Sequence, residues 1–110
     1  MPNQELTRVF QALTDPTRRA VLERLTRGPA AVSELAQPFK MALPSFVQHL
    51  GVLEDCGLVR SKKQGRVRSY TLAPQPLKAA EDWLTVQRGH WERRLDSLDE
   101  FLKTLKEQKR

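Results

Sequence analysis

Five basic side chains lie within a short segment near the middle of the chain, with no acidic residue among them: Arg60, Lys62, Lys63, Arg66 and Arg68. Guanidinium and ammonium groups gathered in this way are typical of proteins that bind the phosphates of nucleic acid. The charge balance supports this interpretation, because residues 1–56 carry no net charge, residues 57–75 carry +5 and residues 76–110 carry +1. The alternative is a solvent-exposed basic hairpin whose charges serve only to prevent strands of other molecules from pairing with its edge.

A helix expected at residues 43–56 supplies a second set of side chains just before this basic segment. Phe46, Leu50 and Leu53 recur at helical spacing, which predicts one face packed into a core. The outer face carries small or hydrogen-bonding side chains near its N-terminal end, the end that a recognition helix presents to the DNA major groove. The residues expected to contact bases there are Pro44, Ser45, Val47 and Gln48.

The basic residues themselves are expected on a β-hairpin. Gly57 suits the left-handed end of the preceding helix, and two β-prone runs follow at residues 58–63 and 66–72. Gln64 and Gly65 connect the two runs, and because Gln-Gly is a weaker signal than Asn-Gly the turn type stays open. A hairpin of this kind would lie over phosphates or reach into an adjacent minor groove.

Shorter segments precede the recognition helix. The first helix is expected at residues 3–13, with one apolar face made of Leu6, Val9, Phe10 and Leu13. Asp15 and Pro16 suit the start of a second helix that runs to about residue 27. Residues 30–32 are compatible with a very short strand, and residues 33–37 with a third helix. A mainly α fold with a small β-hairpin, the winged helix-turn-helix, has these elements in this order.

A long helix is expected from Leu77 to about residue 106. Apolar residues recur in it every seven positions, and a companion stripe is charged in its first half and apolar in its second. A helix of this length is roughly 45 Å long, too long to bury its stripe on its own small domain, so we expect a homodimer. The expected interface comprises Leu84, Trp91, Leu95, Leu98 and Leu102, joined by Leu6, Val9 and Phe10. A helix folded back on its own domain is the alternative.

Composition excludes several other classes of protein. The length fits one structural unit, divided into a DNA-binding domain at residues 1–75 and a C-terminal dimerisation helix at residues 76–110. No membrane-spanning run or leader peptide is visible, so we expect a cytoplasmic protein with no membrane partner. One cysteine and two histidines predict no metal site and no cofactor. They also supply no nucleophile and base set, so we expect no enzymatic activity.

Several of these segments resemble the ArsR/SmtB family of winged-helix repressors. The segment 10–19 resembles the N-terminal signature of the family, segments 32–36, 48–54 and 57–59 its helix-turn-helix core, and segment 65–70 its wing. The resemblance runs from about residue 5 to residue 94. It implies a homodimer, held by the first and last helices, that binds a palindromic operator and represses transcription.

The sequence departs from the family pattern at three positions of the recognition helix. Ala42 stands where a Ser cap is usual, which weakens the helix start by about 1 kcal/mol. Val47 replaces a common Ser and could touch a thymine methyl, while Gln48 replaces a common Lys or Arg and could pair with adenine. The thiol pair and the histidine motifs by which family members sense metals are missing. A sensing role for His90 or Cys56 stays open.

The sequence therefore predicts a homodimeric DNA-binding repressor whose partners are double-stranded operator DNA and a second copy of the chain. Autoregulation, the operator sequence, the regulated genes, the effector and the sign of regulation are left open. Two alternatives remain: a winged-helix module whose long helix recruits a protein, and a ligand-responsive or redox-responsive repressor with a pocket at the dimer interface.

Overall fold

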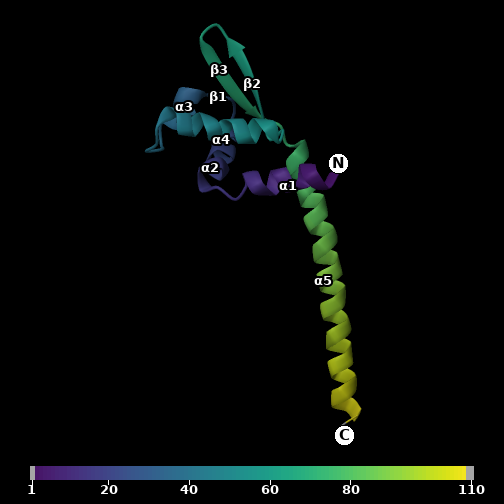
Figure 1. Ribbon diagram of the computed structural model, residues 1–110. Helices are drawn as coiled ribbons and strands as arrows, with labels where there is room; N and C mark the ends of the chain where they lie inside the picture. The colour runs from purple at the N-terminus through teal and green to yellow at the C-terminus, as the bar shows by residue number, and fades with distance from the viewer. Residues whose placement is uncertain (1, 109–110) are drawn as a thin grey trace. The chain divides into compact units, whose positions relative to one another are not determined.

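In the computed structural model, which describes residues 2–108, five helices and three short strands follow one another along the chain (Figure 1). The elements are α1 (Pro2–Ala12), α2 (Pro16–Leu25), β1 (Ala30–Ala31), α3 (Val32–Ala36), α4 (Leu43–Asp55), β2 (Val59–Gln64), β3 (Val67–Leu72) and α5 (Gln75–Gln108). The chain forms two compact units, the first ending at Ala80 and the second beginning at Glu81. The mainly α, winged helix-turn-helix fold predicted from the sequence is confirmed.

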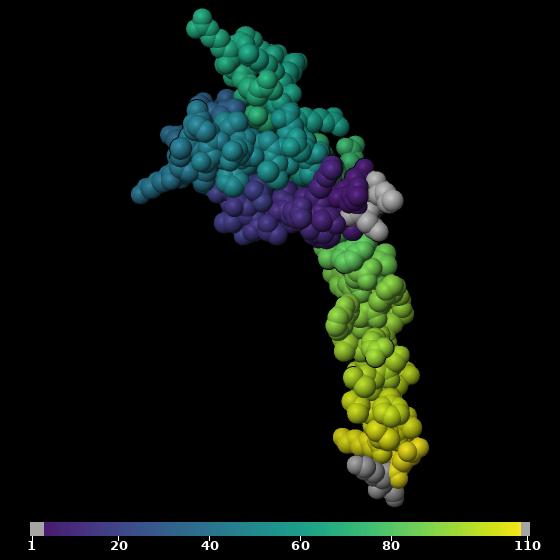
Figure 2. Space-filling view, in the orientation of Figure 1, coloured from purple at the N-terminus to yellow at the C-terminus, as the bar shows by residue number. Residues whose placement is uncertain are grey.

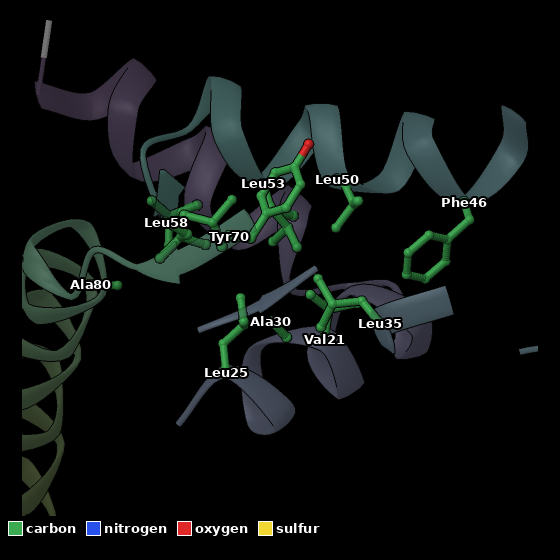
Figure 3. Close-up of a cluster of buried hydrophobic side chains, with 13 residues drawn as sticks. Val21, Leu25, Ala30, Leu35, Phe46, Leu50, Leu53, Leu58, Tyr70 and Ala80 are labelled. Carbon is green, nitrogen blue, oxygen red and sulfur yellow. The ribbon is translucent and has the colours of Figure 1, made fainter. Parts of the chain in front are cut away.

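The core of the first unit is built on the inner face of α4. Phe46, Leu50 and Leu53 are almost completely buried, as their spacing predicted, and they pack with Val21 of α2 and Leu35 of α3 (Figure 3). Leu58, Val59 and Tyr70 extend this core to the base of the hairpin. Because one face of α4 is filled in this way, its opposite face points away from the protein.

The β-structure is a three-stranded antiparallel sheet in the order β1-β3-β2. The hairpin pairs Val59 with Leu72 at its base and Gln64 with Val67 near its tip. β1 pairs only with the base of β3, where Ala30 lies opposite Tyr70 and Ala31 opposite Ser69. The short strand that the sequence left open therefore exists, and it ties the hairpin to the segment between α2 and α3.

Local signals place the ends of the helices. The Asp15 carboxylate accepts a hydrogen bond from the N–H of Arg18 at 3.0 Å and so caps α2, as predicted. Gly57 has φ +81°, the left-handed conformation that ends α4 and that side chains other than glycine disfavour. α2 ends at Leu25, two residues before the predicted end, and α5 continues two residues beyond its own.

The second unit consists of the part of α5 that follows Ala80. α5 as a whole has 34 residues, which corresponds to about 50 Å along its axis. Among residues 2–108, no helix combines the length and the apolar character needed to cross a membrane.

Candidate nucleic-acid interface

The outer face of α4 carries the side chains that the sequence assigned to base contacts. Pro44, Ser45, Val47 and Gln48 are all exposed. They lie in the first two turns of the helix, on the sides that Phe46 and Leu50 leave free. Ala42 precedes the helix in an extended conformation, and no side chain caps this helix start. The first turns of α4 thus present a mixture of polar and apolar groups outward.

The basic side chains are distributed over both faces of the hairpin formed by β2 and β3, which we call the wing. All five are exposed: Arg60, Lys62, Lys63, Arg66 and Arg68. Lys63 lies opposite Arg68 on one face of the ladder, while Lys62, opposite Ser69, lies on the other. Arg66 follows Gly65 in the tight turn, where Gly65 has φ +62°. The wing projects from the body of the first unit (Figure 2) and presents positively charged groups in several directions.

A chain of two hydrogen bonds connects the wing to the recognition helix. Arg68 donates from its guanidinium to the hydroxyl oxygen of Ser61 at 2.8 Å, and the Ser61 hydroxyl donates to the Glu54 carboxylate at 2.7 Å. Tyr70 lies buried on the same face of the hairpin. Burial and the nearby Glu54 carboxylate raise the pKa of the Tyr70 hydroxyl, and the Arg68 charge opposes this rise. One basic side chain of the wing is therefore held toward the C-terminal half of α4.

A second polar cluster connects the other side of α4 to the corner between α1 and α2. The Arg18 guanidinium donates to the carbonyl oxygens of Ala12 at 2.8 Å and Gln11 at 3.1 Å, and lies 3.0 Å from Nδ1 of His49. His49 is thus occupied by a structural contact that the sequence did not reveal.

Asp15 belongs to the same cluster, with its carboxylate 3.7 Å from Nδ1 of His49. Partial burial by itself raises the pKa of the Asp15 carboxyl. The backbone hydrogen bond from Arg18 and the charges of His49 and Arg18 outweigh burial, so the pKa falls below its usual value. This carboxylate is therefore stabilised in its charged form, in which it caps α2.

Comparison with known proteins identifies the family to which this arrangement belongs. A family model described as a helix-turn-helix domain matches residues 13–62. The HTH-type transcriptional regulator Rv2034 of Mycobacterium tuberculosis is 47% identical over 72 residues, which cover 66% of this chain and 67% of that protein. A crystal structure of an ArsR family transcriptional regulator is 58% identical, with a TM-score of 0.79, and the match covers 82% of this chain and 93% of that one. The chain belongs to the ArsR family. It is a DNA-binding transcriptional regulator.

Two further proteins resemble this ArsR family member. The transcriptional repressor SdpR of Bacillus subtilis is 29% identical over 79 residues, which cover 72% of this chain and 88% of that protein. A solution structure from Mycobacterium bovis is described as a homodimeric winged helix-turn-helix DNA-binding domain and as a possible ArsR-family regulator. It is 28% identical, with a TM-score of 0.61, and the match covers 82% of each chain.

The second unit of this ArsR family member exposes an apolar stripe along α5. Trp91 is 68% exposed, and every other α5 residue predicted at the dimer interface is also exposed: Leu84, Leu95, Leu98 and Leu102. In α1, Leu6 and Phe10 are partly buried against the core. Val9 is only 2% exposed and belongs to the core of the first unit, so little of its side chain is accessible to a partner. The apolar face of α1 is divided, with Val9 turned inward.

Among residues 2–108, no three His, Cys, Asp or Glu side chains gather closely enough to hold a metal ion. Cys56 is partly buried at the end of α4, where its thiol donates to the carbonyl oxygen of Leu53 at 3.4 Å. Cys56 also packs against the core of the first unit as a small, partly buried side chain.

Proposed function

We propose that this ArsR family member represses transcription as a homodimer that binds a palindromic operator. The observation that carries the proposal is an exposed wing whose charged residues are all basic, hydrogen-bonded through Arg68, Ser61 and Glu54 to the end of α4, a helix whose first turns are also exposed. In this proposal the wing binds phosphates or an adjacent minor groove, and Ser45, Val47 and Gln48 face bases in the major groove.

Two features support a dimer. The α5 stripe leaves several large apolar side chains exposed, and a second copy of the same stripe would remove them from water. A related structure is described as homodimeric. We assign the interface to Leu84, Trp91, Leu95, Leu98 and Leu102 of α5, with Leu6 and Phe10 of α1. Two-fold symmetry would then present two recognition helices to two half-sites.

Repression as the sign of regulation is supported by the resemblance to SdpR, which is described as a transcriptional repressor. A dimer bound across a promoter would exclude other proteins from the same DNA. We place this action in the cytoplasm, and we propose no cofactor and no catalytic activity.

The test is binding of the purified full-length protein to the DNA upstream of its own gene and to scrambled DNA of equal composition, over a salt series. Zinc and a chelator are each added in parallel. We expect tight binding to the specific duplex, a steep loss with salt and no response to either addition. Release or induction by zinc would contradict the prediction that the chain has no metal site. Weak, salt-independent binding to both duplexes would refute the proposal and favour a module that recruits a protein through α5.

The contribution of the recognition helix is tested by Gln48→Ala. If Gln48 contacts a base, the variant changes which operator bases are preferred, and binding to non-specific DNA stays as in the wild type. Equal losses on every sequence would argue against base reading by this side chain.

A further inference from the structure

One edge of α4 carries two large apolar side chains that the core does not use. Leu43 is 55% exposed and Val47 is 45% exposed, and because they lie four residues apart they are neighbours on the helix surface. Both belong to the first two turns, the part of α4 assigned to the major groove. Isolated exposed apolar residues are ordinary on protein surfaces. An adjacent pair at this position of a recognition helix needs an explanation in terms of what it contacts.

Contacts within the first unit show which way this edge faces. Glu54 lies seven residues after Val47 and so falls on the same edge of α4. Its carboxylate accepts a hydrogen bond from Ser61 of β2, which means that this edge is the one turned toward the wing. Gln48 lies about 100° further round the helix than Val47, on the outermost face. Val47 therefore lies between a side chain able to pair with a base and a basic hairpin able to bind phosphate.

The chemistry of the major groove offers one apolar target at this place. Thymine carries a C5-methyl group there, and the other three bases carry no methyl group. Valine and leucine side chains can neither donate nor accept a hydrogen bond. The feature of a base that they can recognise is therefore a methyl group. We infer that Val47, flanked by Leu43, reads the C5-methyl of a thymine beside the base that Gln48 contacts. This inference rests on the proposed function, and it names thymine as a required base of each half-site.

The expected effect follows from burial of a single methyl group. Removing one buried methyl weakens binding by about four-fold, and removing the symmetric pair from both half-sites weakens it by about fifteen-fold. Deoxyuridine makes this change alone, because it keeps the hydrogen-bonding groups of thymidine and lacks only the C5-methyl.

The experiment begins with selection of a specific duplex from a random pool by the full-length protein. Each symmetric pair of thymidines in that duplex is then replaced by deoxyuridine, and affinity is measured for the wild type and for Val47→Ser. We expect one pair at which the wild type loses affinity by about fifteen-fold. We expect Val47→Ser, already weaker on the unmodified duplex, to lose nothing more at that pair.

Val52→Ser is the matched control, because Val52 is an exposed valine on another side of α4, next to the α1 residues Arg8 and Gln11. This variant should keep the full sensitivity to deoxyuridine. A wild-type protein insensitive to deoxyuridine at every position would overturn the inference while leaving the proposed function intact. Sensitivity that persists in Val47→Ser would overturn the assignment to Val47. Selection that yields no preferred sequence would overturn the proposed function, and the inference with it.

Discussion

Replacing Arg66 at the tip of the wing tests the electrostatic basis of binding most directly. Arg66 is exposed in the hairpin turn, so Arg66→Ala should change the free energy of unfolding by less than about 0.5 kcal/mol. A homodimer presents two wings, and the variant therefore loses two phosphate contacts per complex. Each contact contributes about 0.9 to the slope of log affinity against log salt, so the slope should become shallower by about 1.8. Between 50 and 200 mM salt, the variant should then lose about 12-fold less affinity than the wild type.

The assay is a titration of one labelled duplex at four or more salt concentrations, with wild type and variant measured side by side. Arg27→Ala is the matched control, because it removes the same charge from an exposed position at the end of α2, outside the wing and α4. The control should keep the wild-type slope. An unchanged slope for Arg66→Ala would remove Arg66 from the footprint. Equal changes in both variants would show that net charge, and not the wing, determines the salt dependence.

Three further variants test other parts of the structure. Ala42→Ser adds a hydroxyl that can cap the start of α4, where Ala42 provides no side-chain hydrogen bond. We expect the free energy of unfolding to rise by about 1 kcal/mol and the melting temperature by several degrees. An unchanged melting temperature would contradict this. Asp15→Ala removes the cap of α2 and should cost about 1 kcal/mol at neutral pH. The folded-state pKa of Asp15 lies below its usual 3.8. The stability difference between the wild type and Asp15→Ala should therefore be complete well above pH 3.8 and should shrink as pH falls through the folded-state pKa. Denaturant unfolding at several pH values checks this, and a stability difference independent of pH would refute it. Leu98→Asp places a charge in the α5 stripe and should produce monomers in sedimentation. The control Ser97→Asp, which places the same charge on another side of α5, should leave the dimer intact. Dimers that persist in Leu98→Asp would exclude this residue from the interface.

The features predicted well from the sequence depend on residues that are close together along the chain. The spacing of Phe46, Leu50 and Leu53 gave the buried face of α4, and Gly57 gave its end. The hairpin followed from two β-prone runs around Gly65. The exposure of the basic residues on it followed from their charge. Periodicity, capping and turn chemistry are local, and each can be read without knowledge of the fold.

The features that the sequence did not reveal join distant residues. Arg18 and His49 are 31 positions apart, and neither residue type indicates the other as its partner. The contact between Glu54 and Ser61 depends on how closely the hairpin folds back on α4. β1 has only two residues, so the sequence indicated a possible short strand at this place but not its pairing with β3. Val9 shares a helical face with Leu6 and Phe10, and only the packing of α1 decides which of the three turns inward.

The limited pairing of β1 has a mechanical consequence for the wing. β1 contacts β3 only at Ser69 and Tyr70, so the hairpin from Lys63 to Arg68 continues as two strands without a third. A two-stranded ribbon has little stability of its own, which makes the wing stiff at its base and compliant at its tip. The stiff base holds the wing at a set distance from α4. In the proposed complex, a compliant tip would let Arg66 follow minor grooves of different width, which vary with DNA sequence. One regulator would then keep its proposed phosphate contacts on differently shaped operators and leave the discrimination between bases to the helix.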